Sequence, residues 1–212
     1  MEDRERDLDD VKLDLTIVTA TAFETKAARR ALPGINVIEG GIALAKMTAA
    51  RREAQGGSAA FVSCGLAGGL RPDLPTGAVV IPNDVLRPDG TTLHCDDELV
   101  ARLIRAAEAI GVTPVTEPMV TTGAIVAKGE RARWASRGYA AVDMETGLLR
   151  APRVAAVRVI LDTPQRELSK DWARPAIAAL KPWNWPQLFW LVREGPRCAS
   201  LCAGVIARAL AG

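Results

Sequence analysis

The chain has 212 residues, a formal net charge of +2 and 49% apolar residues, so it is long and apolar enough to bury one sizeable core. The balanced charge and the lack of a basic stripe argue against a nucleic-acid partner. No apolar run approaches the roughly 18 residues that a membrane-spanning helix needs.

The cysteines and the single histidine narrow the possible chemistry. None of the four cysteines belongs to a Cys-x-x-Cys pair, so neither a zinc site nor another metal site is expected. Because His94 is the only histidine, a Ser-His or Cys-His nucleophile is not expected either. The composition suits a reduced, cytoplasmic protein without a cofactor.

The N-terminal residues differ from the rest of the chain. Residues 1–10 carry six acids and two arginines and no apolar segment, which is not the pattern of a signal peptide. We expect residues 1–12 to form a mobile acidic tail and residues 13–212 to form a single α/β domain.

Strands and helices are predicted to alternate along the chain. The expected strands are Leu13–Ala20, Ile35–Ile38, Ala59–Ser63, Ala78–Pro82, Met119–Thr122, Ala140–Val142 and Val154–Leu161. The expected helices are Thr25–Ala31, about Leu44–Gln55, one capped by Asp96 and closed by Gly111, Lys128–Ser136, Gln187–Arg193 and Arg197–Ala211, the last two joined by Gly195-Pro196. The alternation predicts an α/β fold with a parallel or mixed sheet.

Three acids follow predicted strands. Asp162 comes directly after the β-branched run Val154–Leu161, which suits a strand buried on both faces. Glu145 follows Ala140–Val142, and Glu24 follows the first strand. Open α/β sheets bind ligands beyond the carboxyl ends of their strands, so these acids are the first candidates for chemistry. The alternative for each acid is a helix cap or a salt bridge.

A glycine-rich segment, Cys64 to Leu70, follows the strand at Ala59–Ser63 and is predicted to be a loop. Its glycines would let backbone N–H groups approach a ligand closely. The spacing matches neither the G-x-G-x-x-G fingerprint nor a P-loop, so it does not predict a dinucleotide site.

Five segments together carry a family resemblance. They are Thr19-Ala20-Thr21-Ala22-Phe23-Glu24, Gly65-Leu66-Ala67-Gly68-Gly69-Leu70, Gly123, Val142-Asp143-Met144-Glu145 and Val157-Arg158-Val159-Ile160-Leu161-Asp162. In this order they resemble the purine nucleoside phosphorylase and methylthioadenosine nucleosidase superfamily, over roughly residues 13–163. The resemblance implies a three-layer α/β/α fold with a central mixed sheet. It also implies a homo-oligomer, with a dimer favoured.

The resemblance assigns roles to single residues. Met144 and Glu145 would bind the ribose, with Glu145 accepting hydrogen bonds from its 2′- and 3′-hydroxyls. Asp162 would protonate N7 of a purine, and Glu24 would hold the attacking water. Further substrate-binding positions would be Ala67, Gly68, Gly123 and Val126, of which Val126 stands where relatives stack an aromatic residue on the base.

This chemistry has a clear physical basis. Breaking an N-glycosidic bond leaves positive charge on the sugar and negative charge on the base. An acid at N7 neutralises the leaving base, and such general-acid assistance is worth roughly 10²–10⁴ in rate. Burial among Val159, Ile160 and Leu161 is expected to raise the pKa of Asp162, while the other two carboxylates favour the cationic sugar.

The choice between hydrolysis and phosphorolysis rests on two positions. Ser63 stands where phosphorylases of this superfamily place an arginine for phosphate, and Leu66 replaces a hydroxyl residue of the loop. With Glu24 present as a water base, hydrolysis is favoured. A phosphorylase with phosphate as co-substrate, held by Arg71 or another arginine, is the alternative. An inactive nucleoside-binding protein is the third reading, motivated by Val126 and by short segments after Ala31 and after Glu145.

The C-terminal region, about residues 172–212, is rich in tryptophan, and four of the five tryptophans lie between Trp172 and Trp190. The run Trp183–Leu191 and the sequence Asp162-Thr163-Pro164 resemble hopanoid-associated members of the superfamily, which are implicated in removing adenine from adenosylhopane. The expected partner is therefore a nucleoside or nucleoside-lipid. Trp183, Trp185, Phe189 and Trp190 also suggest peripheral contact with the inner membrane face. The alternative is that they pack a terminal helix or a subunit interface.

Overall fold

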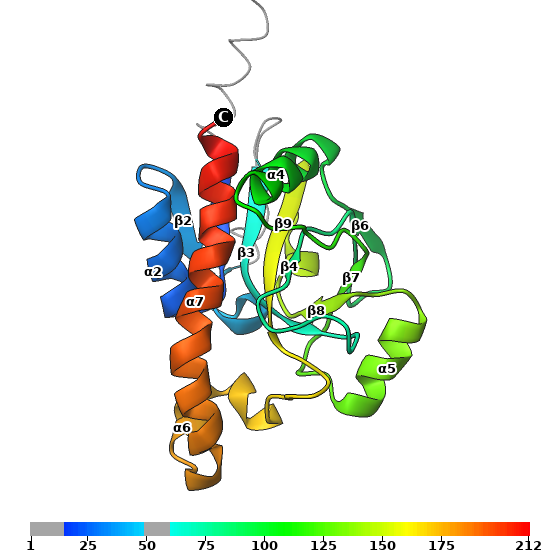
Figure 1. Ribbon diagram of the computed structural model, residues 1–212, viewed down its shortest axis with the longest axis vertical. Helices are drawn as coiled ribbons and strands as arrows, with labels where there is room; N and C mark the ends of the chain where they lie inside the picture. The colour runs from blue at the N-terminus through cyan, green and yellow to red at the C-terminus, as the bar shows by residue number, and fades with distance from the viewer. Residues whose placement is uncertain (1–14, 49–59) are drawn as a thin grey trace, which may run out of the picture.

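The computed structural model describes residues 15–48 and 60–212 (Figure 1). The predicted acidic tail and most of the helix expected after Leu44 lie outside the described residues. The strands are β1 (Leu15–Thr19), β2 (Asn36–Glu39), β3 (Ala60–Gly69), β4 (Val79–Val80), β5 (Asp84–Leu86), β6 (Thr92–His94), β7 (Met119–Thr121), β8 (Ala141–Asp143) and β9 (Arg153–Asp162). The α-helices are α2 (Ala22–Ala31), α4 (Asp97–Ala109), α5 (Lys128–Ser136), α6 (Pro175–Ala179) and α7 (Trp185–Leu210). Short 3₁₀ helices are η1 (Ile42–Leu44), η2 (Thr146–Leu148), η3 (Lys170–Ala173) and η4 (Pro182–Asn184).

The strands of the described residues form one mixed sheet in the order β2-β1-β3-β8-β7-β5-β6, with β9 paired to β3 and β4 to β9. The ten-residue strands β3 and β9 run parallel along most of their length. Near its end β3 also pairs with β8, antiparallel, through Gly68 and Gly69. The register of β3 against β9 shifts between Ala67 and Gly68, which brings Gly68 opposite Asp162. Such an irregularity commonly re-aims side chains near a functional site.

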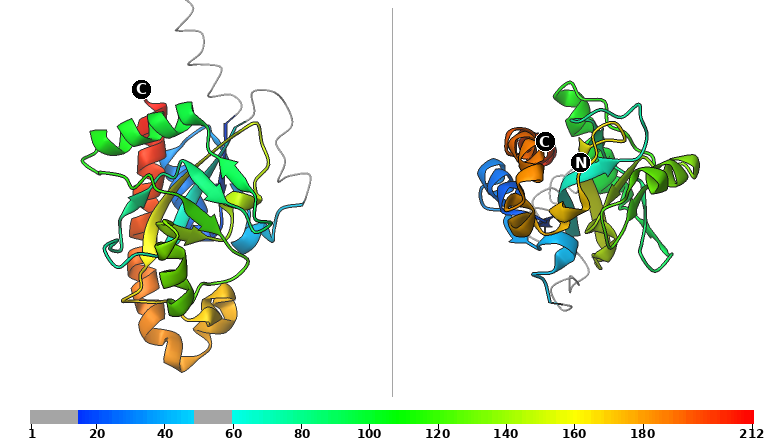
Figure 2. Two further views of the ribbon diagram at one scale, coloured as in Figure 1. Left: turned by 90° about the vertical axis from the view of Figure 1, so that its right-hand side faces the viewer. Right: turned by 90° about the horizontal axis from the view of Figure 1, so that it is seen from below.

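Helices cover both sides of this sheet. α7 packs on strands β3 and β9 and on helices α2 and α4, so α2, α4 and α7 form one layer (Figure 1). α5 lies on the opposite side of the molecule from α2 and α7 (Figure 2). The predicted α/β/α arrangement around a mixed sheet is therefore confirmed. Between β8 and β9 only the short η2 is present, in agreement with the short segment noted after Glu145.

The local signals at two helix starts are confirmed. Thr21 accepts a hydrogen bond from the Glu24 N–H, and the Glu24 side chain accepts one from the Thr21 N–H, which makes a capping box for α2. Asp96 caps α4 by accepting a hydrogen bond from the N–H of Leu99 at 2.9 Å. Every residue of β9 after Arg153 is buried, as the apolar run predicted.

The prediction of a glycine loop after Ser63 was wrong, because Cys64 to Gly69 continue strand β3. These glycines serve close packing rather than a turn. A Cβ atom at Gly69 would lie 3.1 Å from the Ile160 side chain of β9, and one at Gly65 would be tighter still. Glycine in a strand interior commonly marks such close approach.

The two predicted C-terminal helices are one helix, α7, with Pro196 inside it. Proline removes one backbone donor, but the long packed face of α7 compensates for that loss. At the same point Gly195 packs against the ring of Phe23 on α2, where a Cβ atom would lie 3.4 Å from the ring. Across the described ranges, no helix has the length and apolar character needed to cross a bilayer.

Candidate active site

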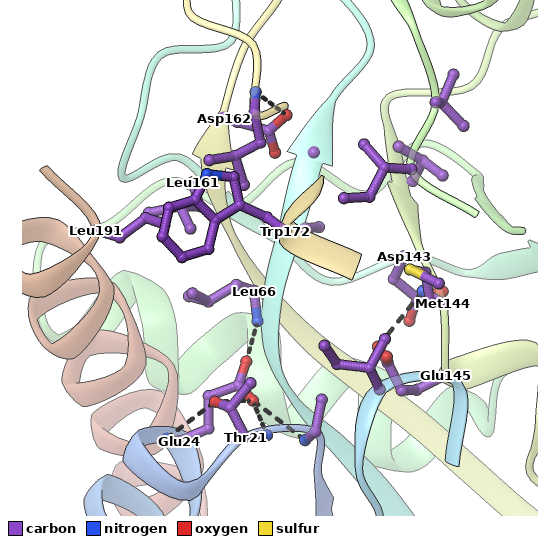
Figure 3. Close-up of a pocket in the computed structure, with 18 of the residues that line it drawn as sticks. Thr21, Glu24, Leu66, Asp143, Met144, Glu145, Leu161, Asp162, Trp172 and Leu191 are labelled. Atoms are coloured by element: carbon purple, nitrogen blue, oxygen red, sulfur yellow. Dashed lines mark hydrogen bonds between the residues drawn. The ribbon is translucent and has the colours of Figure 1, made fainter. Parts of the chain in front are cut away.

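A cavity of about 470 Å³ opens where β3, β8 and β9 end, between α7 and the start of α2 (Figure 3). Its walls are mainly apolar. The lining residues to which the sequence assigned a catalytic or substrate-binding role are Glu24, Ala67, Gly68, Val126, Met144, Glu145 and Asp162. Gly123 is not among the lining residues, although its neighbours Thr122 and Ala124 are. The three candidate acids therefore face one shared space.

Glu24 is held rigidly at the start of α2. Its Oε2 atom accepts hydrogen bonds from the N–H of Ala20 (3.1 Å) and from the N–H and hydroxyl of Thr21 (2.6 and 2.7 Å). Its Oε1 atom accepts one from the N–H of Leu66 on β3, at 2.9 Å. A carboxylate oxygen has two acceptor sites, so Oε1 retains capacity for a water or a substrate hydroxyl.

A buried arginine, Arg158 of β9, ties Asp143 of β8 and the following Glu145 to the sheet. One of its terminal nitrogens lies 2.6 Å from Asp143 and 3.5 Å from Glu145. The same nitrogen donates to the hydroxyls of Ser63 (2.6 Å) and Thr146 (2.9 Å). Although burial opposes its charge, the carboxylates of Asp143, Glu145 and Glu24 raise the pKa of Arg158. Arg158 therefore remains charged and acts as a fixed cation behind the cavity.

Glu145 is the acid with the most perturbed ionisation. Burial raises its pKa to about 7, opposed by Arg158 and reinforced by the charges of Asp143 and Glu24. Its hydrogen-bond partners are the N–H of Ala43, 3.1 Å from Oε1, and the N–H of Met144, 3.4 Å from Oε2. A carboxyl that changes charge near neutral pH inside a cavity is a common mark of a functional group.

The segment that contacts Glu145 has a strained backbone. Ala43 and Leu44 both have φ of 54°, in the left-handed region that non-glycine residues rarely adopt. This strain places the Ala43 N–H against Glu145. Sequence analysis expected a helix from about Leu44, and the described part is instead the 3₁₀ helix η1 followed by a turn. Strain of this kind, roughly 1–2 kcal/mol per residue, tends to collect at functional sites.

Asp162 is paired rather than isolated. Its Oδ2 atom forms a buried ion pair with Arg131 of α5 and lies 3.5 Å from the N–H of Leu168. Arg131 also donates to the carbonyl oxygens of Gly69 (2.7 Å) and Val126 (3.2 Å). Sequence analysis expected an acid surrounded by apolar residues, and it missed Arg131. The sequence predicted the helix that carries Arg131, but no motif spacing connects residues 131 and 162, so their pairing could not be predicted.

Other residues considered from the sequence lie away from the cavity. Arg71 pairs with Asp73 (2.7 Å) and Glu117 (2.8 Å) and is not a lining residue. The exposed His94 pairs with Asp84 at 2.6 Å. In the part of the chain that the structure describes, no group of three or more His, Cys, Asp or Glu side chains could hold a metal ion.

The apolar walls were predicted only in part. Trp172, from η3, lies across the cavity from Met144 and beside Leu66 and Leu161 (Figure 3). Leu188, Leu191 and Val192 of α7 also line the cavity, as does Phe23 of α2. The tryptophan-rich region thus reaches the cavity through Trp172 and α7 rather than through Trp183 or Trp185. The expectation that Trp190 faces a membrane was wrong, because its ring is buried in the core beneath Arg166.

The family model of the phosphorylase superfamily matches residues 32–176, well over half of the sequence. The chain belongs to this superfamily. A comparison with curated proteins found no match. The matched segment includes β3 with Gly68, β9 with Asp162, and β8, which is followed by Glu145.

Solved structures share the fold at low sequence identity. A mutant 5′-methylthioadenosine/S-adenosylhomocysteine nucleosidase of Helicobacter pylori, solved with 5′-methylthioadenosine in its active site, is 12% identical with a TM-score of 0.67, covering 93% of this chain and 98% of its own. The native futalosine hydrolase of H. pylori is 12% identical with a TM-score of 0.65, covering 95% and 99%. The corresponding nucleosidase of Neisseria meningitidis, bound to methylthio-immucillin-A, is 16% identical with a TM-score of 0.63, covering 92% and 97%.

Proposed function

We propose that the protein is an N-ribosyl hydrolase that releases adenine from a 5′-substituted adenosine. The observation that carries this proposal is the placement of Glu24, Glu145 and Asp162 around one cavity with apolar walls. Membership of the phosphorylase superfamily supports a reaction at an N-glycosidic bond. The names of the similar structures, nucleosidases and a hydrolase, agree with this class of reaction.

Each acid has surroundings that suit a different task. Glu145, held by Ala43 and Arg158, would accept hydrogen bonds from the ribose hydroxyls. Glu24, fixed by the backbone around Thr21 and by Leu66, would orient a water toward C1′. Both carboxylates would stabilise the positive charge that develops on the sugar.

Asp162 would act at the base, in concert with Arg131. A buried ion pair with Arg131 holds the carboxyl of Asp162 in place at the cavity wall, and from there Asp162 would supply the proton that N7 gains as the glycosidic bond breaks. Gly68 keeps the approach to this acid open, since a Cβ atom there would lie 3.1 Å from Asp162 Oδ1. Val126, buried on the same side, would contact the base through its methyl groups.

The cations of the site favour hydrolysis over phosphorolysis. Among the described residues that line the cavity, the single arginine is Arg131, and it is paired with Asp162. Ser63 is fully buried against Arg158, which the acids of the site already neutralise. Arg71, the other arginine considered for phosphate, binds two acids elsewhere. A phosphate dianion would therefore meet no unpaired cation in the described cavity wall.

The 5′ substituent is proposed to be large and apolar. Phe23, Leu188, Leu191 and Val192 form an apolar margin beside Glu24, and Phe23 and Val192 are themselves partly exposed to solvent. This margin suits a hydrocarbon group better than a charged one. Together with the resemblance of the tryptophan-rich run, it makes adenosylhopane, a precursor in hopanoid biosynthesis, our specific candidate.

A panel of adenosine nucleosides, incubated with and without phosphate and analysed for free adenine by chromatography, tests this proposal. We expect adenine to be released without phosphate, and faster from nucleosides with apolar 5′ groups than from adenosine itself.

Asp162→Asn should retain the fold by circular dichroism and lose about 10²-fold or more in turnover. Asp73→Asn, outside the cavity, should leave turnover unchanged. Strict phosphate dependence would indicate a phosphorylase. Tight adenosine binding with no product after long incubation would indicate a binding protein.

A further inference from the structure

Large exposed apolar side chains gather at one end of the molecule. Within the described ranges, six of the eight lie in the segment that runs from α6 through η4 into the first turns of α7. We call this set the apolar patch: Ile177, Leu180, Trp183, Trp185, Phe189 and Val192. The most exposed are Leu180 (82%), Trp183 (72%), Phe189 (72%) and Val192 (67%). Exposed apolar side chains that gather in one segment commonly mark an interaction site.

Polar contacts beneath the patch hold it in this conformation. Asn184, which is buried, donates to Asp171 and to the carbonyl of Ala178, both at 3.1 Å. Lys181 pairs with the same Asp171 at 2.6 Å. Asn184 thus points inward while the neighbouring Trp183 and Trp185 are exposed, the reverse of ordinary packing. The patch therefore belongs to a segment whose conformation is fixed by these polar contacts.

The patch continues along α7 to the cavity. Trp185, Phe189 and Val192 have the spacing i, i+4, i+7, so they form one stripe of the helix. Val192, the last of them, also lines the cavity, as does the neighbouring Leu188. In Figures 1 and 2, α6 and the start of α7 protrude below the sheet, away from the C-terminus. A surface that contacts the patch would therefore also meet the margin of the cavity.

Charge indicates what contacts the patch. Residues 170–197 contain five basic and two acidic residues, and Arg174 and Arg193 are exposed. A two-fold interface between copies would set this positive excess against itself, which is unfavourable. An anionic bilayer instead attracts basic residues, and tryptophan favours the boundary between headgroups and acyl chains.

We propose that the apolar patch docks on the surface of an anionic lipid bilayer, with Trp183, Trp185 and Phe189 at the headgroup boundary. The cavity margin at Val192 and Phe23 then lies next to the lipid, so an apolar 5′ group could enter from the bilayer. This inference goes beyond the proposed function. Its test measures lipid binding without turnover, so either proposal can fail while the other stands.

Flotation with vesicles of phosphatidylcholine and phosphatidylglycerol in equal parts provides the test. Wild-type protein should float with these vesicles, and less of it should float with phosphatidylcholine alone or at high salt. Trp183→Ala/Phe189→Ala should lower the partition coefficient about tenfold or more, since two large apolar contacts are lost. Ile110→Ala, an exposed apolar residue at the end of α4, is the matched control and should bind like wild type.

Unfolding temperatures and adenine release from a water-soluble nucleoside would verify that the double variant is intact. The proposal is overturned if wild type stays in the unbound fraction with both kinds of vesicle, or if the double variant and wild type partition equally. Sedimentation equilibrium identifies the competing occupant. A wild-type dimer that the double variant dissociates, with no vesicle binding, would make the patch an interface between copies of this chain.

Discussion

Glu145 and Asp162 come from different strand ends and line the same cavity, but they differ in how closely an arginine pairs with each of them. Arg158 lies 3.5 Å from Glu145 but is shared with Asp143, so burial dominates and the pKa of Glu145 rises to about 7. Asp162 instead has Arg131 as a direct partner. The site therefore holds one carboxyl near its titration point and another in an ion pair. Groups whose environments differ in this way can take different roles in one reaction.

The raised pKa of Glu145 predicts an acid limb in the pH profile. Below about pH 7 the free enzyme carries the protonated acid, which accepts fewer hydrogen bonds from ribose hydroxyls. We expect kcat/KM to fall about tenfold per pH unit below that value. In Glu145→Gln this limb should disappear and kcat/KM should be low throughout. An unchanged acid limb in Glu145→Gln would assign the ionisation to another group.

At this scale the sequence predicted the acids but not their partners. Glu24, Glu145 and Asp162 could be picked out as candidates because each follows an apolar run that reads as a strand. Arg131 was not, since its pairing with Asp162 depends on how α5 docks against the ends of β3 and β9. The expectation of an unpaired acid failed for the same reason.

At the scale of elements, strand β3 organises the site. It pairs with β1 over its first residues, with β9 from Ala60 to Gly68, and with β8 through Gly68 and Gly69. Gly65 and Gly68 lie beside Glu24, Arg158 and Asp162, with no room for larger side chains at the glycines. The glycines suggested a loop because glycine is rare in strands. The requirement for close packing, which only tertiary structure shows, explains why the strand continues.

Gly65→Ala should damage the site from within β3. The added Cβ atom would lie 2.6 Å from Glu24 Oε1 and 2.8 Å from an Arg158 terminal nitrogen, so both side chains must move. We expect a loss of about 1–3 kcal/mol in the free energy of unfolding and a large loss of base release. Gly204→Ala on α7 is the control, because no atom lies within 4 Å of its added Cβ. The two variants would be compared by thermal unfolding and by adenine release, and equal activities would refute the assigned packing.

The helix prediction at the C-terminus failed for a related reason. Gly195-Pro196 is a common helix break, and local sequence preference favours two helices there. In the structure α7 continues through both residues because it packs along α2, β3 and β9. Its length matters for the site, since one helix supplies both the apolar patch and the cavity wall at Leu188, Leu191 and Val192.

For the whole molecule, the mixed sheet and its helical layers place three acids and an apolar margin around one cavity. Val192, which lines that cavity, also belongs to the apolar patch. The fold class was predictable from alternating strand and helix patterns. The strand order, the pairing of the end of β3 with both β8 and β9, and the left-handed backbone at Ala43 could not be predicted, since they depend on contacts between distant segments. The superfamily match and the shared cavity both support the proposed reaction.

The origin of the oxygen added at C1′ tests hydrolysis most directly. The protein would be incubated with a 5′-substituted adenosine and phosphate in ¹⁸O-labelled water, and the sugar product would be analysed by mass spectrometry before its anomeric oxygen exchanges. If Glu24 delivers water at the cavity, the released sugar carries one labelled oxygen and no phosphate. Formation of an unlabelled sugar 1-phosphate, or no release of adenine at all, would contradict the account.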